Sequence, residues 1–418
     1  MSRLPLDGVL VVALEQAVAA PLATRNLADL GARVVKVERP GGGDLARGYD
    51  RLVHGTGAHF VWLNRGKQSM AVDLKISATR DAVRRLVDRA DVVVQNLAPG
   101  AARRLGLDAA SLRADRPELV VGSISGYGAG GSMQDRKAYD MLIQAEAGLI
   151  SLTGTPETAV KTGIPASDIA SGMYLAQALL AALLRRFRTG EGATVDVSMF
   201  EATVEWVSHA LYSQVATGVQ PRRMATGHAS IAPYDAYPTA DGELLIGVQS
   251  EPGWRALTRV LGLEDAAADL RFATNVDRVR HRDACDALVA TCTRSWTTAD
   301  LDAALARAGV PAAQVRGMDH VVAHPQLRDR DRWRTVRTAH ATVPALLPPA
   351  TFADVEAAMG DVPALGSHTV ELLLESGLDR AAVDQLVVSG AAVQAAAPSP
   401  VPQVSRPRVE QEQPWTST

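Results

Sequence analysis

The stretch GVLVVALEQAVAAPLATRNLADLGARVVKVE, residues 8–38, decides the fold class. It begins with a continuous apolar run over 8–14 that has the β-branched bias of a buried strand. Pro21 opens a helix, and Gly31 ends it before a second apolar run at 33–38. A strand, a helix and a second strand in this order predict the start of a Rossmann-like α/β fold.

Further apolar runs extend the same pattern along the chain. They lie at 69–74, 91–96, 119–125 and 193–198, and helical patterns separate several of them. Alternation of this kind is typical of a mostly parallel sheet that helices cover on both faces. We therefore expect an α/β protein with a large parallel-sheet domain.

The chain changes character after about residue 220, where a polar crossing follows the last helical pattern of the large domain. Asp241-Gly242 predicts a hairpin turn, and helical patterns follow it. We expect residues 1–220 to belong to the large domain and 225–325 to form a smaller α/β domain. Residues 326–390 then return to the large domain with two closing helices, and the proline-rich tail 391–418 is expected to be disordered.

Charge and composition exclude several kinds of partner. The formal net charge of −3 and the pI near 6.3 do not indicate the excess of positive charge that a nucleic-acid-binding protein needs. The sequence has neither a signal-peptide pattern nor about 18 uninterrupted apolar residues, so we expect a cytoplasmic protein without a membrane partner. Cys285 and Cys292 lack any metal or redox spacing, which predicts reduced thiols and no metal site.

A dinucleotide-binding enzyme is the obvious rival, since Glu38 ends the second strand where such folds place a ribose-binding acid. The first turn, EQAVAAP, excludes it, because no glycine stands where G-x-G-x-x-G would admit a pyrophosphate. The glycine run GGGD at 41–44 is interpreted as a flexible loop.

Asp168 stands at the start of a long apolar helix, MYLAQALLAALL at 173–184, which we expect to be buried on most of its circumference. One interpretation is a helix N-cap, and the other is a catalytic carboxylate. Small residues favour the second, since Ser171-Gly172 would leave room for a ligand. The helix dipole and free N–H groups are expected to hold the carboxylate ionised.

Several separated motifs point to one family. They include PLDGVLVVAL, GARVVKVERPGGGD, NRGKQSMAVDLK, VVQNLAPGAARRLG, SGYGAGG, KAYD, VDVSMFEA and PALGSHT. Together these motifs resemble the class III coenzyme A transferases, the group of formyl-CoA transferase and carnitine CoA-transferase, which is related to the α-methylacyl-CoA racemases. The resemblance runs from about Leu4 to Val388.

The resemblance implies a function and a site. Asp168 matches the family's nucleophile, which would move CoA between an acyl-CoA and a small carboxylic acid through an aspartyl intermediate. CoA is then substrate and product, and no cofactor is bound permanently. The implied CoA contacts are Val18, Ala19, Arg39, Val72, Lys75, Asn96, Leu97, Ala98, Arg104, Lys137, Tyr139 and Asp140. The family further implies ring-shaped subunits that interlock as a homodimer.

Two other functions stay open at this point. A racemase needs an acid–base pair, and Tyr139 occupies the position where the racemases carry histidine. A phenol, whose pKa in peptides is about 10, is a poor base at neutral pH. A silent CoA-binding protein is the second alternative, against which Asp168 argues. The segments LIQAEAGLISLTG (142–154) and EATVEW (201–206) resemble those of members that act on four- or five-carbon dicarboxylates such as mesaconate, itaconate, citramalate or succinate. The isolated His59 and His228 are interpreted as structural.

Overall fold

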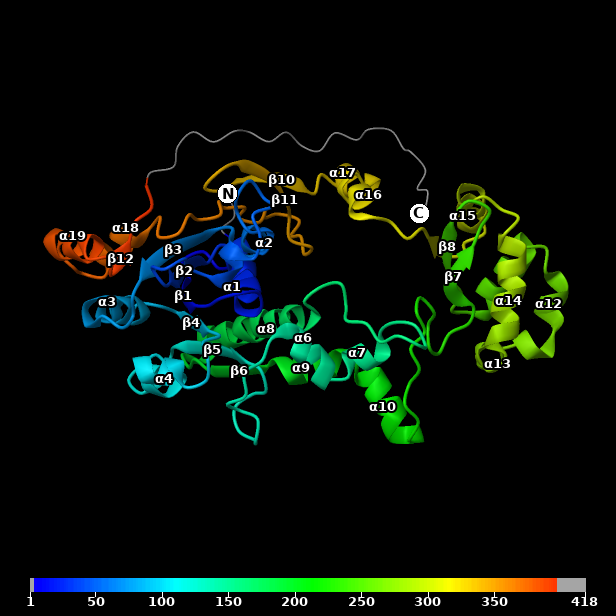
Figure 1. Cartoon of the computed structure of the whole chain (residues 1–418), viewed down its shortest axis with the longest axis horizontal. Coiled ribbons are helices and arrows are strands. Elements are labelled where there is room, and N and C mark those ends of the chain that lie inside the picture. The colour runs from blue at the N-terminus through cyan, green and yellow to red at the C-terminus, as the bar shows by residue number, and fades with distance from the viewer. Residues whose placement is uncertain (1–3, 397–418) are drawn as a thin grey trace. The chain divides into compact units, whose positions relative to one another are not determined.

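The computed structural model describes residues 4–396 of the 418-residue chain (Figure 1). This part of the chain divides into two compact units, each described here by itself. The first unit takes in residues 4–149, 162–209 and 325–396. The second takes in residues 150–161 and 210–324.

A seven-stranded sheet organises the first unit, with the strand order β12-β3-β2-β1-β4-β5-β6. All neighbours pair in parallel except β12, which runs antiparallel to β3. The strands are β1 (Leu10–Leu14), β2 (Arg33–Glu38), β3 (Lys67–Val72), β4 (Val92–Gln95), β5 (Val120–Ser125), β6 (Thr194–Ser198) and β12 (Ala392–Val393). The expected α/β class with a mostly parallel sheet is thereby confirmed, and every strand of the parallel set overlaps an apolar run read from the sequence.

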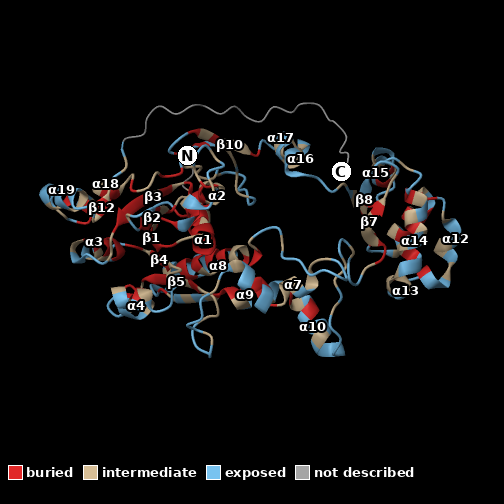
Figure 2. Ribbon diagram, in the orientation of Figure 1, coloured by how far each residue is buried: buried red, intermediate tan, exposed pale blue. Residues whose placement is uncertain are grey.

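Both faces of the sheet are buried, which is why its strands read as continuous apolar runs. In β1, Val11 and Ala13 point to one hydrophobic cluster, whereas Val12 and Leu14 point to the other. Figure 2 shows the strands as the most deeply buried part of this unit. The sheet therefore forms the middle of three layers.

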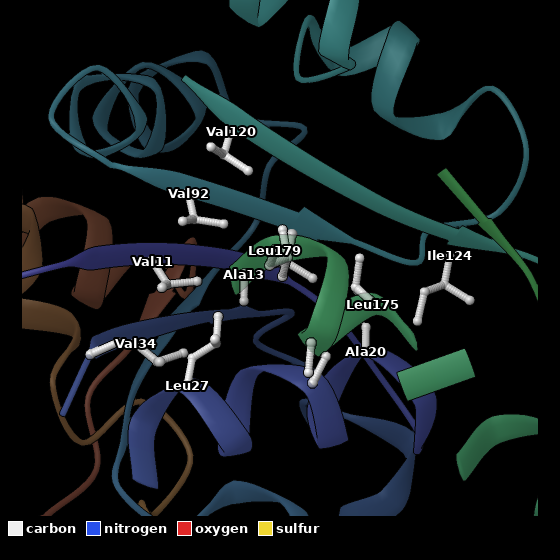
Figure 3. Packing of buried hydrophobic residues seen from close by; sticks show 14 of the residues in the cluster. Val11, Ala13, Ala20, Leu27, Val34, Val92, Val120, Ile124, Leu175 and Leu179 are labelled. Atoms are coloured by element: carbon white, nitrogen blue, oxygen red, sulfur yellow. The ribbon is translucent and has the colours of Figure 1, made fainter. Parts of the chain in front are cut away.

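Helices α1 (Ala19–Asp29) and α8 (Ala166–Thr189) cover the first face. Figure 3 shows Leu27 of α1 and Leu175 and Leu179 of α8 among the side chains packed on strands β1, β2, β4 and β5. The opposite face packs against α3 (Ser77–Val87), α18 (Thr369–Glu375) and α19 (Arg380–Val388).

Gly172 allows α1 and α8 to lie in close contact. A Cβ atom at this position would stand 2.5 Å from the carbonyl oxygen of Ala19. Ser171 is fully buried, and its hydroxyl donates to the carbonyl of Ser167 at 2.6 Å. The prediction that Ser171-Gly172 leaves room for a ligand is therefore wrong, because these small residues make room for the neighbouring helix.

The outer face of α8 also differs from the expectation. Met173, Leu180, Leu184 and Phe187 are exposed, so the helix is not buried on most of its circumference. Within the described residues, α8 alone is long and apolar enough to span a membrane by length and composition, and half of that window is buried. A core helix of a globular protein meets the same test, so this is weak evidence for a membrane segment.

The remaining elements of the first unit are short. They are η1 (Leu45–Gly48), α2 (Ala58–Asn64), α4 (Ala101–Leu105), α5 (Ala109–Arg113), α6 (Asp140–Glu146), α9 (Met199–Trp206), α17 (Pro325–Asp329), β10 (Trp333–Arg337) and β11 (Thr342–Leu346). Two helices, α7 (Leu149–Leu152) and α10 (Ser208–Thr217), cross from one unit into the other.

The second unit is a small α/β assembly around an antiparallel sheet of β7 (Tyr234–Pro238), β8 (Glu243–Gly247) and β9 (Ala312–Ala313). The hairpin predicted at Asp241-Gly242 joins β7 to β8. Trp254 is among the largest side chains buried in its core. Its helices are α11 (Glu251–Val260), α12 (Glu264–Ala268), η2 (Leu270–Phe272), α13 (Asn275–Arg280), α14 (Arg282–Thr293), α15 (Thr298–Arg307) and α16 (Met318–Val322).

The start of the C-terminal segment is ordered. Ala392 pairs with Val72 of β3 and is only 1% exposed, so residues 392–393 extend the large sheet. The expectation of disorder from residue 391 is wrong for this strand, because its alanine fills an apolar place at the sheet edge. Residues 397–418 of the expected tail lie outside the described residues.

Candidate active site

The residues expected to bind CoA follow the strands of the large sheet. Since β1 to β5 run in parallel, their carboxyl ends share one edge, where α/β proteins bind ligands. The structure brings all of them to the ends of these strands or to the segments that follow. Val18 and Ala19 follow β1, and Arg39 follows β2. Val72 is the last residue of β3, and Lys75 follows it. After β4 come Asn96, Leu97, Ala98 and Arg104, and after β5 come Lys137, Tyr139 and Asp140.

The cations of this set are exposed. Arg39 donates through Nε to the carbonyl of Gly43 at 3.0 Å. Within the described residues, the side chains of Lys75, Arg104 and Lys137 have no hydrogen-bond or ion-pair partner. Their charged ends can therefore meet phosphate oxygens without breaking an existing contact.

The turn between β1 and α1 is fixed from two sides. Asn96 accepts from the backbone N–H of Gln16 at 2.9 Å and donates to its carbonyl at 2.9 Å. Ala17 has a φ of 64°, a left-handed conformation that costs a non-glycine residue roughly 1 kcal/mol. Its N–H donates to Asp44 Oδ1 at 2.8 Å, which stabilises that conformation.

The GGGD segment is ordered by its last residue. Asp44 is 3% exposed, accepts from the N–H of Ala46 at 2.9 Å and pairs with Lys36 at 2.7 Å. A Cβ atom at Gly43 would lie 2.6 Å from Glu38 Oε2, so the glycine permits a close approach. The interpretation of this segment as a flexible loop is therefore wrong.

Asp168 is the third residue of α8 and does not cap it. The N-cap position belongs to Pro165, which makes no side-chain cap hydrogen bond. Asp140 caps the helix instead, because its Oδ1 accepts from the N–H groups of Ser167 at 2.8 Å and Asp168 at 3.1 Å. In the described part of the chain, the Asp168 carboxylate itself has no hydrogen-bond or ion-pair partner. The N-cap interpretation is thus wrong, and the carboxylate is free for another role.

The electrostatic setting of Asp168 also differs from the expectation. Burial, followed by the negative charge of Asp140, raises the pKa of Asp168 from 3.8 to about 7. The helix dipole therefore does not hold this carboxylate ionised at acidic pH, because desolvation and the like charge outweigh it. A desolvated, unpaired carboxylate is a stronger nucleophile than a solvated one.

The neighbours of Asp168 include residues that sequence reasoning missed or rejected. Ile169 packs against the cluster of Val18, Leu22 and Leu63, which places the start of α8 beside the start of α1. The phenol of Tyr49 has its pKa raised by burial and by the charges of Asp44 and Asp168, so it stays protonated near the carboxylate. His59 lies edge-on to Tyr49 at 5.8 Å, and its buried Nδ1 has no hydrogen-bond partner. No motif in the sequence marks either residue.

Histidine and cysteine side chains elsewhere form no comparable site. His228, in the second unit, stacks on Tyr234 with ring centres 5.4 Å apart. Cys285 is a buried free thiol and Cys292 a partly buried one. Between residues 4 and 396, no group of three or more His, Cys, Asp or Glu side chains could hold a metal ion.

Comparisons with known proteins agree on one family. A family model described as CoA-transferase family III matches residues 6–369. The chain is 34% identical to the succinate–glutarate CoA-transferase of Agrobacterium fabrum, covering 89% of this chain and 95% of that protein. It is 33% identical to the succinyl-CoA:mesaconate CoA-transferase of Haloarcula marismortui, covering 90% and 97%. A CAIB/BAIF family crystal structure from Brucella suis superposes with a TM-score of 0.78 at 36% identity, covering 90% of this chain and all of that one.

Proposed function

We propose that this chain, which belongs to CoA-transferase family III, moves CoA from an acyl-CoA thioester to a carboxylic acid through an intermediate on Asp168. The observation that carries the proposal is the Asp168 carboxylate, which is partly buried and unpaired within the described residues and begins α8 beside the start of α1. A buried carboxylate without a partner is costly, and such groups are typical of functional sites.

The first half-reaction transfers CoA to the enzyme. The ionised carboxylate of Asp168 attacks the thioester carbonyl, the carbon–sulfur bond breaks, and CoA leaves as a thiolate. The product is a mixed anhydride between the acyl group and Asp168. The thiolate then attacks the aspartyl carbonyl of the anhydride, which releases the donor acid and leaves CoA on Asp168 as a thioester.

The second half-reaction repeats these steps in reverse with the acceptor acid. Its carboxylate attacks the aspartyl thioester, and the CoA thiolate leaves as a second anhydride forms. Attack of the thiolate on the acyl carbonyl of this anhydride gives the new acyl-CoA and regenerates Asp168. No net proton transfer or redox change occurs, so the scheme requires no general base.

The CoA contacts implied by the sequence fit this scheme as proposals. Lys75, Arg104 and Lys137 offer unpaired charges for the phosphates, and the tight β1–α1 turn around Ala17 approaches the reacting end. Relatives named for succinate, glutarate and mesaconate favour a C4–C5 dicarboxylate as one substrate. The phenol of Tyr49 can donate a hydrogen bond to a substrate oxygen near Asp168.

One experiment separates the transferase from a racemase. Tyr139, at the position where the racemases carry histidine, is 71% exposed and stands at the N-cap of α6. The enzyme is incubated in D2O with a 2-methylacyl-CoA, with and without succinate, and both label and CoA distribution are followed by mass spectrometry. We expect succinate-dependent movement of CoA and no deuterium at the α-carbon. Deuterium uptake without movement of CoA to the acid would identify a racemase instead.

The proposed assembly is a homodimer, as the family implies. Met173, Leu180, Leu184 and Phe187 expose apolar area along one side of α8, which a second copy would cover. If two ring-shaped subunits interlock, dilution cannot release folded monomer. Sedimentation velocity at nanomolar protein is therefore expected to show dimer only. A folded monomer at that concentration would rule out interlocking.

A further inference from the structure

A cavity of about 620 Å³ opens in the first unit between α1, α2 and the β10–β11 hairpin. Arginines dominate its polar lining, and no aspartate or glutamate contributes to it. None of the residues expected to bind CoA lines it. Its arginines are Arg25, Arg65, Arg330 and Arg332.

The buried arginines of this cavity are short of counter-charge. Arg25, Arg65 and Arg332 are 8%, 5% and 8% exposed. Asp29 binds Arg65 through both carboxylate oxygens, at 2.8 and 2.7 Å. The same carboxylate lies 3.7 Å from Nε of Arg25, and this nitrogen makes no hydrogen bond. The other two nitrogens of Arg25 donate to the neutral oxygens of Trp62 (backbone, 3.4 Å) and Asn26 (side chain, 2.8 Å). One carboxylate thus serves two buried guanidinium groups.

The other two arginines, unlike Arg25 and Arg65, have no acidic partner among the described residues. Arg332 donates to the backbone carbonyls of Leu347 and Pro348, and Arg330 is exposed and makes no hydrogen bond or ion pair within residues 4–396. Burial and the charge of Arg65 lower the pKa of Arg25 to about 10, which shows the strain of this arrangement. Buried cations with too few counter-charges destabilise the fold, and an anion in the cavity would offset this.

We propose that this cavity binds a multivalent organic anion, a polycarboxylate or a phosphate ester, at a site separate from the one that holds the thioester. Guanidinium groups suit both anions, because their paired N–H donors match two oxygens of a carboxylate or phosphate. The volume lies within the range of small-molecule sites. The indoles of Trp62 and Trp333 form part of the wall and accommodate the apolar body of such a ligand.

The position of Trp62 provides a readout of binding. Its indole lines the cavity and meets the ring of His59, 6.3 Å away, which in turn meets Tyr49 near Asp168. An anion that settles against Trp62 and Trp333 changes the surroundings of two of the chain's six tryptophans. Intrinsic fluorescence therefore reports occupancy without any assay of CoA transfer.

The test titrates the full-length protein with citrate, AMP and inorganic phosphate, followed by tryptophan fluorescence and calorimetry. We expect citrate or AMP to bind and inorganic phosphate to bind more weakly. If citrate binds more tightly than AMP, the natural ligand is a polycarboxylate, and if AMP binds more tightly, it is a phosphate ester. Arg330→Gln is expected to weaken binding about tenfold, because it removes one charge-assisted contact. Arg328→Gln removes the same charge two residues away, outside the cavity, and is expected to change affinity less than about twofold.

Arg25→Met is a second variant, which changes a buried arginine of the cavity. It is expected to abolish binding, because it removes a buried cation from the cavity, and an unfolding curve measured beside it checks that the variant is folded. Absence of binding by the wild type at about 10 mM citrate and AMP would overturn the proposal. So would equal losses in Arg330→Gln and Arg328→Gln, or full competition by desulfo-CoA, which would assign the binding to the CoA site. A change of sedimentation in Arg330→Gln without anion binding would make the cavity an interface between copies.

Discussion

Asp168→Asn is expected to lower the rate of CoA transfer by at least about a thousandfold, because an amide cannot form the anhydride and thioester intermediates. Binding of CoA should change little, since the substitution keeps the size of the side chain. The measurement is transfer of CoA from an acyl-CoA to a small carboxylic acid, followed by mass spectrometry. Incubation of the wild type with acyl-CoA followed by borohydride should label Asp168, and the variant should stay unlabelled. Turnover by the variant at a tenth of the wild-type rate would exclude covalent catalysis by this residue.

The pH dependence of the wild type gives an independent readout. The pKa of Asp168 is raised to about 7, and only the ionised carboxylate attacks the thioester, so most of the enzyme is active only above this pH. We expect kcat/KM to rise with pH, to inflect near pH 7, and to fall about tenfold per unit on the acid side. A flat profile between pH 5 and about 8 would contradict the proposed role of an unpaired, desolvated carboxylate.

The same variant is expected to be more stable than the wild type at pH 8. The folded-state pKa of Asp168 lies above its ordinary value of 3.8, so folding favours the protonated form, and the carboxylate destabilises the fold once both states are ionised. Asp168→Asn should therefore raise the unfolding temperature at pH 8, and the gain should vanish near pH 4. Asp81→Asn, an exposed substitution in α3, is the matched control and should leave both activity and stability unchanged.

The large sheet could be predicted from the sequence because both of its faces are buried. Such strands are mostly apolar, and the runs around Val11 and Val92 show this most clearly, whereas Lys36 interrupts the run around Val34. Glycine and proline then delimit the helices between them. In the smaller unit, the turn pair Asp241-Gly242 predicts the hairpin of β7 and β8. The boundaries near 225 and 325 and the cytoplasmic location are not tested by these observations and stay predictions.

The details around Asp168 could not be predicted, because they depend on segments far apart in the chain. Asp140 caps α8 from 28 residues away, and this contact both frees the Asp168 carboxylate and adds a like charge beside it. The sequence predicts space for a ligand at Gly172, although α1 fills the space beside this residue. Local pattern shows which residues are small or charged. It does not show which distant segment uses them.

A cluster of buried charges explains how the β1–α1 turn keeps its conformation, and it carries the second large prediction. Glu15, Lys36 and Lys67 have fully buried side chains, with Lys67 Nζ 2.6 Å and Lys36 Nζ 3.3 Å from the same oxygen of Glu15. Lys36 also pairs with Asp44 at 2.7 Å, and Asp44 holds the N–H of Ala17. The two negative charges of Glu15 and Asp44 balance the two positive charges of Lys36 and Lys67. Removal of any one of these charges therefore leaves an uncompensated charge in the interior.

Glu15→Gln is therefore expected to lower the free energy of unfolding by about 3–5 kcal/mol, since it leaves Lys67 buried without its carboxylate. The double variant Glu15→Gln/Lys67→Met restores the balance of charge and should be more stable than the single variant. Asp88→Asn, which breaks an exposed pair with Arg84, should cost less than about 1 kcal/mol. Urea unfolding of all variants at one protein concentration measures these differences. If the double variant is no more stable than Glu15→Gln, the loss comes from packing, and the charge balance is not what fixes the β1–α1 turn.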